Sequence, residues 1–271
     1  MPPVDIAAPV IDNVRLSADY NVLTLAAPHI GALTRPGQFV MVRPDRGTDP
    51  LLRRPFSVFE ILRDDGGAPS GISILSKRAG RTTGLLYEAR PGDVVHCLGP
   101  LGRPFGPLGT ATEAWMVAGG VGLAPFATLA EALMAAGTPA TLFYGARTGA
   151  ELFYLDLFER LGVRLVLATE DGSRGAHGRV TAPLDAALTA LARPGAAKVF
   201  TCGPEPMLAA VAAVAARHGQ PCEVSVERVM GCGLGGCYSC VIPVREGDGP
   251  AHFVRSCIAG PVFDAATIAW D

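Results

Sequence analysis

Short, mainly hydrophobic runs are separated by polar and turn-forming residues over the first third of the chain. Runs rich in β-branched and aromatic residues occur at 22–26, 38–43, 56–62, 71–77 and 93–98. Proline and glycine separate the runs, as in Arg35-Pro36-Gly37 and Arg90-Pro91-Gly92. No long stretch in this region repeats with the period of a helix. Short strands between such turns predict an antiparallel barrel or sandwich.

The pattern changes after Gly109, where strand-like runs begin to alternate with helical stretches. The predicted strands are 114–118, 140–144, 163–169, 198–202 and 222–227, and the predicted helices are 125–136, 182–192 and 205–218. Gly137 and Gly219 stand where C-caps belong. Alternating strands and helices predict parallel α/β units.

From about residue 228 onward the chain is rich in glycine and cysteine, and this third unit is too small to have a core of its own. Such a unit needs a metal to fold. A length of 271 residues suits two domains and a short appendix. We therefore predict units at 1–106, 107–227 and 228–271.

Composition and charge limit which kinds of partner the protein can bind and in which cellular compartment it is expected. A net charge of −2 and a pI near 6.2 give no basic field to hold a phosphate backbone, which argues against a nucleic-acid partner. The first residues lack the basic start and apolar run of a signal peptide, and no run of about 20 apolar residues predicts a membrane span. We expect a cytoplasmic protein, in which clustered cysteines indicate a metal rather than disulfides.

Four of the seven cysteines lie in the last 40 residues and follow a recognisable spacing. Cys232, Cys237 and Cys240 form C-x4-C-x2-C, and Cys257 follows after sixteen residues. This is the spacing of plant-type [2Fe-2S] proteins. A structural zinc site with four cysteines is the alternative, but zinc sites commonly repeat a second C-x2-C pair and only Cys257 is present here.

The other three cysteines, Cys97, Cys202 and Cys222, lie on or beside predicted strands and are expected to be buried small hydrophobic residues. Cys202 is a special case. Thr201-Cys202-Gly203-Pro204 ends a strand at the carboxyl edge of the parallel sheet, where open α/β folds bind ligands. Cys202 and Gly203 are therefore candidate cofactor-binding residues.

A glycine-rich turn follows the first predicted strand of the α/β unit. Gly119, Gly120 and Gly122 precede Pro125 at the predicted helix start. Glycines there allow a pyrophosphate to approach the helix N-terminus, whose free N–H groups favour anions. The turn departs from G-x-G-x-x-G, so a simple packing turn is the alternative.

The sequence is compatible with either NADH or NADPH. An acidic residue after the second strand would bind the ribose hydroxyls of NADH, but the chain has Gly145-Ala146-Arg147 there. Arg147 could suit the 2′-phosphate of NADPH or be a solvated turn residue.

Several motifs together resemble the ferredoxin–NADP reductase superfamily. They are Arg54-Pro55-Phe56-Ser57 after Pro36-Gly37-Gln38-Phe39-Val40, Gly99-Pro100-Leu101-Gly102, the stretch from Gly119 to Pro125, and Cys202-Gly203-Pro204. With the C-terminal cysteines, the chain most resembles electron-transfer subunits of class B dihydroorotate dehydrogenase, nearly end to end. The resemblance implies a six-stranded antiparallel barrel that binds FAD, a Rossmann-like domain that binds NAD(H) or NADP(H), and a C-terminal [2Fe-2S] extension.

The resemblance also implies roles for single residues. Arg54 and Pro55 begin the flavin motif, Arg54 reaching the FAD pyrophosphate, while Phe56 stacks on or beside the flavin and Ser57 hydrogen-bonds near flavin N5. Further expected contacts are Ile74, Leu75 and Ser76 on a second flavin strand, Gly80, Thr82 and Thr83 in a phosphate loop, Asp171 in Thr169–Ser173, and Glu227 near the flavin. Thr82 stands where the family commonly has glycine. Asp171 could equally belong to an ordinary polar turn, and Glu227 could be a surface glutamate.

The implied activity is electron transfer between a nicotinamide nucleotide and a partner, with no catalytic side chain of its own because cofactors carry the chemistry. The resemblance names the FMN-containing dihydroorotate dehydrogenase catalytic subunit as partner. Related small subunits of an NADPH–ferredoxin oxidoreductase, a hydrogenase or a sulfite reductase share the same motifs. A zinc-stapled nucleotide-binding regulator is the alternative that is not an enzyme.

Overall fold

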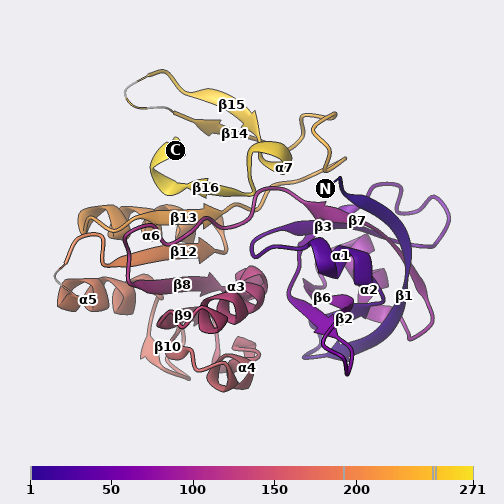
Figure 1. Cartoon of the computed structure of the whole chain (residues 1–271), viewed down its shortest axis with the longest axis horizontal. Coiled ribbons are helices and arrows are strands. Elements are labelled where there is room, and N and C mark those ends of the chain that lie inside the picture. Colours follow the sequence, from indigo (N-terminus) through magenta and orange to yellow (C-terminus); the bar gives the residue numbers. More distant parts are fainter. Residues whose placement is uncertain (1, 192, 246, 248, 271) are drawn as a thin grey trace.

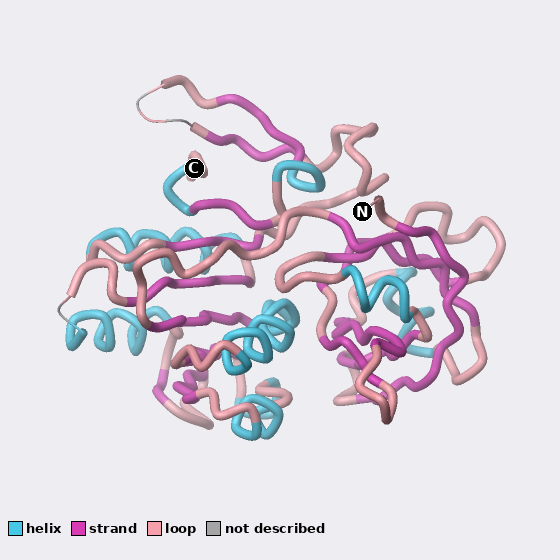
Figure 2. Tube along the Cα trace, viewed as in Figure 1, coloured by secondary structure: helices cyan, strands magenta, loops and turns pink. Residues whose placement is uncertain are grey.

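The computed structural model describes residues 2–191, 193–245, 247 and 249–270. Within these residues, two seven-stranded sheets and one two-stranded sheet form three neighbouring parts (Figure 1). The N-terminal barrel lies on the right of the view, the α/β sheet on the left, and the C-terminal hairpin above them. Figure 2 shows that helices flank the α/β sheet, whereas strands and loops make up most of the other two parts.

The barrel accounts for the first hundred residues. Its strands are β1 (Val4–Arg15), β2 (Tyr20–Leu25), β3 (Phe39–Pro44), β4 (Arg54–Ser57), β5 (Glu60–Arg63), β6 (Pro69–Lys77) and β7 (Val94–Leu101), in the order β4-β3-β7-β1-β2-β6-β5. All pairs are antiparallel. The short helices α1 (Pro28–Leu33) and α2 (Arg81–Glu88) accompany them.

The strand predicted at 56–62 is bent into β4 and β5, and this bend closes the barrel. Val58 N donates to Gln38 O at 3.1 Å, beside β3, and Phe59 N donates to Ser73 O of β6 at 2.9 Å. The two strands at the ends of the sheet are thus one run of chain. When β4 and β5 are counted as one strand, the barrel has six strands. The predicted six-stranded antiparallel barrel is therefore confirmed. The pattern did not predict β1, whose exposed positions mix apolar residues such as Ile11 and Val14 with charged ones, or the short helices.

The α/β sheet is parallel except at one edge. Its strands are β8 (Glu113–Gly119), β9 (Ala140–Ala146), β10 (Arg164–Thr169), β11 (Ala176–His177), β12 (Ala197–Cys202), β13 (Cys222–Ser225) and β16 (Val262–Asp264), in the order β11-β10-β9-β8-β12-β13-β16. The helices are α3 (Ala124–Ala135), α4 (Leu155–Arg160), α5 (Thr181–Leu191) and α6 (Glu205–Arg217). The short helical turns are η1 (Gly120–Leu123), η2 (Gly149–Glu151) and η3 (Ala265–Thr267).

The five predicted strands and three predicted helices of this part are present, and α4, β11 and β16 are additional. The predicted helix 182–192 extends to residue 192, which lies outside the described residues. The predicted strand 222–227 ends early, at Ser225, because Val226 N instead donates to Pro261 O at 3.0 Å.

Alternate strand positions supply two separate cores. Met116 and Leu142 pack on the α3 side of the sheet, while Val117 and Phe143 pack toward α5 and α6. Because successive side chains point to opposite faces, the continuous apolar runs of β8 and β9 serve both layers.

The C-terminal segment connects the other two parts. It contains β14 (Val241–Val244), β15 (His252–Arg255) and α7 (Ser256–Ala259). Strand β16 pairs antiparallel with β13, while Met230, Cys240 and Cys257 pack against Phe39 and Met41 of the barrel. The boundaries at 106/107 and 227/228 stay predictions.

A buried ion pair holds the connection between the barrel and the α/β sheet. Lys198 Nζ on β12 lies 2.7 Å from Glu223 Oε1 on β13 and donates to Pro107 O at 2.7 Å. Gly106 N donates to the second oxygen of Glu223 at 2.9 Å. The side chains of Lys198 and Glu223 are only 9% and 19% exposed. This pair therefore fixes the linker against the sheet.

Across the described part of the chain, no helix combines the length and apolar character that crossing a bilayer requires.

Candidate functional site

A cavity of about 990 Å³ lies where the three parts of the molecule meet. The barrel contributes residues from β3, β4, β6 and α2, the α/β sheet contributes the ends of β12 and β13, and the segment 226–230 closes one side. The predicted site residues that line it are Arg54, Pro55, Phe56, Ser57, Leu75, Gly80, Thr82, Thr83, Cys202 and Glu227. Its volume is at the upper end of what cofactor pockets occupy.

The cationic side chains of the cavity suit a diphosphate. Arg54, Lys77 and Arg81 line the cavity, together with the first turn of α2, which contains no acidic residue. Asp49 also lines it and pairs with Arg81 at 3.1 Å. Thr83 Oγ1 accepts hydrogen bonds from Gly80 N and Ala79 N at 2.9 and 2.8 Å, which fixes the entry to the helix. No atom lies within 4 Å of where a Cβ of Gly80 would be, so a phosphate has room to approach the helix N-terminus. The residues present therefore fit the FAD pyrophosphate.

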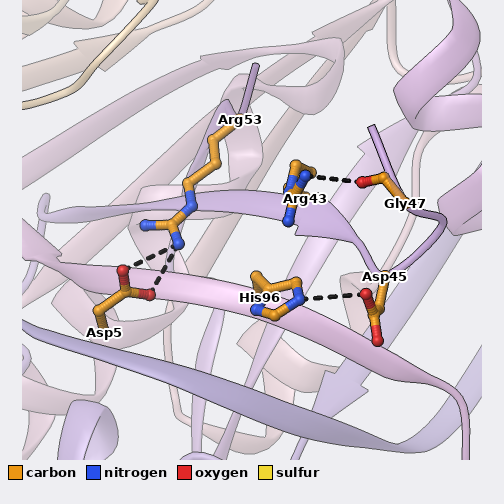
Figure 3. Close-up of polar contacts among 6 residues, drawn as sticks. All are labelled: Asp5, Arg43, Asp45, Gly47, Arg53 and His96. Carbon is orange, nitrogen blue, oxygen red and sulfur yellow. Dashed lines mark hydrogen bonds and ion pairs between the residues drawn. The ribbon is translucent and has the colours of Figure 1, made fainter. Parts of the chain in front are cut away.

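The loop between β3 and β4 forms a rim of the cavity through Asp49–Leu52. Figure 3 shows how the outer face of the barrel anchors this loop: Arg53 Nη2 bonds both oxygens of Asp5 at 2.8 and 2.9 Å, Arg43 Nη1 donates to Gly47 O at 2.9 Å, and His96 Nε2 lies 3.2 Å from Asp45 Oδ1. Arg53 thus positions its neighbour Arg54 without lining the cavity itself.

The alternation of strand β6 separates the three predicted residues 74–76. Leu75 lines the cavity with Lys77, two positions on. Ile74 and Ser76 lie in the other register, where they are 0% and 1% exposed, and Ile74 belongs to the barrel core. A period of two could have identified Lys77 in place of Ile74 and Ser76.

The glycine-rich turn contributes its neighbours, not its glycines, to the cavity. Val121 and Ala124 line it. At Gly122 a Cβ would collide with the carbonyl oxygen of Cys202, so this glycine permits close packing of the β8 and β12 ends. Gly120 has a φ of 55° and open space around it, so a ligand could approach its backbone.

One wall of the cavity holds a thiol and a carboxyl. Burial raises the pKa of Cys202, and the nearby Glu227 raises it further, so the thiol stays protonated. Glu227 lines the cavity and is exposed to solvent there, and the protein around the carboxyl raises its pKa by partial desolvation. Gly203 follows Cys202 with backbone close to Gly119. The structure therefore brings Cys202 and Glu227 together beside the predicted flavin strand β4.

Asp171 lies apart from the cavity. It is exposed on the loop after β10, and its N–H donates to Arg147 O at 3.1 Å. Ser173, whose hydroxyl and N–H both bond Asp171 Oδ1, also accepts from Gly149 N at 2.7 Å. The loops after β9 and β10 are thereby joined at the carboxyl edge of the sheet.

The four clustered cysteines form two pairs. Hydrogen bonds with Ser239, followed by those with Cys232, lower the pKa of Cys237 to about 6. Burial and then the hydrogen-bonded Cys240 raise the pKa of Cys257 to about 12. Among the described residues, no three His, Cys, Asp or Glu side chains converge on a single metal position. Two adjacent thiol pairs suit a cluster with two irons.

The loop around these cysteines depends on its glycines. Gly233 and Gly235 have φ values of 72° and 82°. A Cβ on Gly233 would lie 2.5 Å from Met41 Cγ, and one on Gly235 would lie 2.8 Å from Ile258 Cγ1. Leu234 N donates to Cys232 Sγ at 3.4 Å, as expected of a loop that directs amides toward thiolates.

The cavity and the cysteine pairs share a wall. Phe39 and Met230 line the cavity, and both belong to the apolar cluster that contains Cys240 and Cys257. Phe39 lies in the motif that carried the resemblance, but nothing in the local sequence singles out Met230. Only the fold brings it to this position.

Two family models match the chain. Residues 227–269 match the iron-sulfur cluster binding domain of dihydroorotate dehydrogenase B, and residues 116–213 match an oxidoreductase NAD-binding domain. The first match contains all four clustered cysteines and favours an iron–sulfur cluster over zinc. The second contains the glycine-rich turn and the Cys202-Gly203 strand end.

Relatives of known identity match over nearly the whole chain. The dihydroorotate dehydrogenase B (NAD(+)) electron transfer subunits of Desulforamulus reducens and Bacillus caldolyticus are 35% and 37% identical over 250 and 249 residues, with 90% and 91% of each chain covered. A solved structure of an NADH-dependent reduced ferredoxin–NADP oxidoreductase, described for flavin-based electron bifurcation, superposes with a TM-score of 0.80 at 28% identity, covering 98% of this chain and 91% of the other. The chain therefore belongs to the family of dihydroorotate dehydrogenase B electron transfer subunits.

Proposed function

We propose that this chain carries electrons between NAD(H) and the FMN-containing catalytic subunit of a dihydroorotate dehydrogenase, in pyrimidine biosynthesis, through FAD and one [2Fe-2S] cluster. When bound, FAD would supply hydride exchange with the nucleotide and single-electron exchange with the cluster, which is chemistry that side chains do not supply. The chain itself holds these groups at fixed distances. The observation that carries the proposal is the wall of Phe39 and Met230 shared by the cavity and the cysteine pairs.

The barrel side of the cavity is proposed to bind FAD. Arg54 and the first turn of α2 would hold the pyrophosphate, because a guanidinium and free helix N–H groups both favour anions. Phe56 would cover the flavin ring, and the Ser57 hydroxyl, which can donate or accept, would face its polar edge.

The α/β side is proposed to present the nicotinamide. The carboxyl ends of β8 and β12, with Gly120 and Gly203, lie beside the cavity through Val121 and Cys202. In open α/β sheets ligands bind at this edge. A neutral, buried Cys202 thiol would support the nicotinamide ring without reacting with it.

The partner is proposed to dock over the cysteine segment. Apolar side chains exposed around the cysteines are Val229 at 78%, Tyr238 at 62%, Leu234 at 55% and Ile258 at 49%. A group of exposed apolar side chains is found more often at a protein–protein contact than on a surface that faces only solvent. Docking there would place the acceptor next to the exposed Cys237.

Anaerobic titration of the purified full chain with NADH, followed by optical and EPR spectra, tests the proposal. Bleaching of the flavin band together with a reduced-cluster EPR signal is expected. Flavin bleaching without that signal would contradict the relay. A colourless protein that contains zinc would instead support the alternative of a zinc-stapled nucleotide-binding regulator.

The variant Cys237→Ser provides a second test of the proposed electron transfer. It should leave flavin reduction by NADH largely intact and abolish electron delivery to the catalytic subunit. Equal loss of both would mean that the cysteines only stabilise the fold.

A second candidate is a subunit of a ferredoxin-linked oxidoreductase, favoured by the match over 98% of the chain to the solved bifurcating enzyme. The two candidates differ in partner. Reconstitution with the catalytic subunit and dihydroorotate should reduce NAD⁺ in the first case and not in the second.

We also propose a cytoplasmic location, supported by seven free cysteines in the structure. Detection of the native protein in a membrane or periplasmic fraction would contradict it.

A further inference from the structure

Arg147 lies at a position where the residue type affects the choice between NADH and NADPH. It follows β9 directly, at the carboxyl edge of the strand next to β8. In parallel α/β nucleotide domains an acidic residue near this point binds the ribose hydroxyls of NAD, and an arginine can accommodate the 2′-phosphate of NADP. By itself, Arg147 would indicate NADPH.

The strand order shows which half of the nucleotide meets Arg147. β12, whose Cys202 lines the cavity, lies on one side of β8, and β9 and β10 lie on the other side. A nucleotide with its nicotinamide at the cavity and its pyrophosphate at the turn after β8 would therefore extend its adenosine over the loops after β9 and β10.

The Arg147 guanidinium already has an anionic partner. Its Nε donates to Glu151 Oε2 at 3.2 Å, and its Nη2 pairs with Glu151 Oε1. This hydrogen bonding lowers the pKa of Glu151 and raises that of Arg147, so both stay charged. A two-point contact of this kind occupies the Nε/Nη2 edge of the guanidinium, one of the edges that could bind a phosphate, and offsets its positive charge.

Glu151 is held firmly in place. Its side chain is 21% exposed, whereas that of Arg147 is 65% exposed. The buried Tyr144 hydroxyl lies 3.2 Å from Glu151 O and 3.3 Å from Gly120 O, so it ties this residue to the glycine-rich turn. Glu151 N also donates to Thr148 O at 3.1 Å.

The adjoining loop adds negative charge. Glu170 N donates to Ala146 O and Asp171 N donates to Arg147 O, both at 3.1 Å, so both acidic residues lie on the loop beside Arg147. Hydrogen bonds from Ser173 lower the pKa of Asp171 and keep it ionised. Arg174 is the other cation of this loop. The loops that hold Arg147 and Arg174 thus also hold three acidic residues, Glu151, Glu170 and Asp171, and Lys77 of the barrel is a further cation near Glu151.

We propose that Glu151 is a specificity-determining residue: by holding the Arg147 guanidinium, it denies a 2′-phosphate its cation and makes this chain select NADH over NADPH. The inference rests on the proposed function, since it concerns the nucleotide that reduces the flavin. It assigns the choice to a residue that contacts another side chain instead of the nucleotide.

Glu151→Gln tests the inference in the full-length holoprotein. Flavin reduction is followed anaerobically with NADH and with NADPH, and the ratio of their second-order rate constants is compared with that of the unaltered chain. Freeing Arg147 should improve NADPH by roughly tenfold, the equivalent of about 1.4 kcal/mol, and change NADH far less. An equal change for both nucleotides, or no change, would overturn the inference.

Two further variants make the assignment specific. Glu151→Gln combined with Arg147→Met should restore the original preference, because the released cation is gone. If the gain for NADPH persists, the phosphate is bound elsewhere, for example by Arg174, and the inference fails. Asp156→Asn is the matched control: it breaks an exposed ion pair of the same spacing, Asp156 to Arg160 at 2.6 Å, on α4. It should leave the nucleotide ratio unchanged.

A binding measurement tests the inference without flavin reduction. Calorimetry of the full chain with 2′,5′-ADP and with 5′-ADP should show tighter binding of the 2′-phosphorylated compound only after Glu151→Gln.

Failure of the proposed function can be told apart from failure of the inference. If neither nucleotide bleaches the flavin of the unaltered protein, the proposed function is wrong, whereas equal bleaching by both overturns only the inference.

Discussion

Phe39 and Met230 come from the barrel and from the segment before the cysteines, and together they separate the cavity from Cys240 and Cys257. They are both 3% exposed. The two side chains therefore exclude water between the proposed flavin site and the proposed cluster, and they fix how far apart the two lie.

Met230→Ala should both destabilise the protein and slow electron passage to the cluster. Removing a buried methionine side chain costs about 2–5 kcal/mol. Urea unfolding gives the first quantity, and freeze-quench EPR after mixing with NADH gives the second. Val229→Ala is the control, since Val229 is 78% exposed and its truncation should change stability by less than about 0.5 kcal/mol. Equal effects of the two variants would contradict the assigned role of Met230.

Lys198→Met should loosen the joint between the barrel and the α/β sheet. Breaking a buried ion pair on one side typically costs about 3–5 kcal/mol, because the other charge is left unpaired. Lys198→Met with Glu223→Met should recover much of this loss of stability, since no charge then stays buried. If the linker sets the domain angle, the double variant should still transfer hydride from NADH to the flavin more slowly than the unaltered protein. Stopped-flow reduction beside urea unfolding separates the two effects, and full recovery of both would exclude a positioning role.

The free energy of unfolding should fall as the pH rises above the ordinary range of carboxyl pKa values, because the pKa of Glu131 is raised in the folded state. Glu131 on α3 and Glu60 on β5 face each other across the two domains: burial raises the pKa of both carboxyls, and Glu60 raises that of Glu131 further. The folded state thus holds a proton that the unfolded state releases above about pH 4.5, the ordinary value. The stability contributed by the protonated carboxyl is complete below that pH and is lost as the pH rises through the folded pKa.

Glu131→Gln should therefore increase the free energy of unfolding at pH 7 and leave it nearly unchanged at pH 4. Glu88→Gln, at an exposed position on α2, controls for the loss of one negative charge. A gain at pH 7 that the control reproduces would assign the effect to net charge instead of to the interface.

The glycines of the turn after β8 should respond differently to alanine. Gly122→Ala places a Cβ against the carbonyl of Cys202 and should impair folding of the α/β sheet. Gly120→Ala meets no neighbouring atom but adopts a φ of 55°, so it should cost only about 1–2 kcal/mol while weakening nucleotide binding. Thermal unfolding with a nucleotide titration distinguishes them, and equal loss of stability would contradict separate roles.

Local sequence identified most elements because each carries its own signal. Short β-like runs between Pro and Gly turns predicted β2, β3, β6 and β7, and the strand–glycine–helix order predicted β8 to β13 apart from the two-residue β11. The signal failed where an element depends on its surroundings. β1 mixes apolar and charged residues on its exposed face, β16 has only three residues, and the bend at Val58 and Phe59 exists because the barrel has to close.

The chemistry of the site was also partly local. The spacing of Cys232, Cys237, Cys240 and Cys257 predicts four thiols suited to two irons, because this property depends on residue type and short spacing. The binding of phosphate and flavin by Arg54 to Ser57 is implied by the family resemblance and stays a prediction. Tertiary structure alone decided that Met230 joins Phe39, that Lys77 and Leu75 rather than Ile74 and Ser76 face the cavity, and that Glu151 holds Arg147. Each of these depends on which side chains meet across strands, loops and domains, and packing sets those distances once the chain has folded.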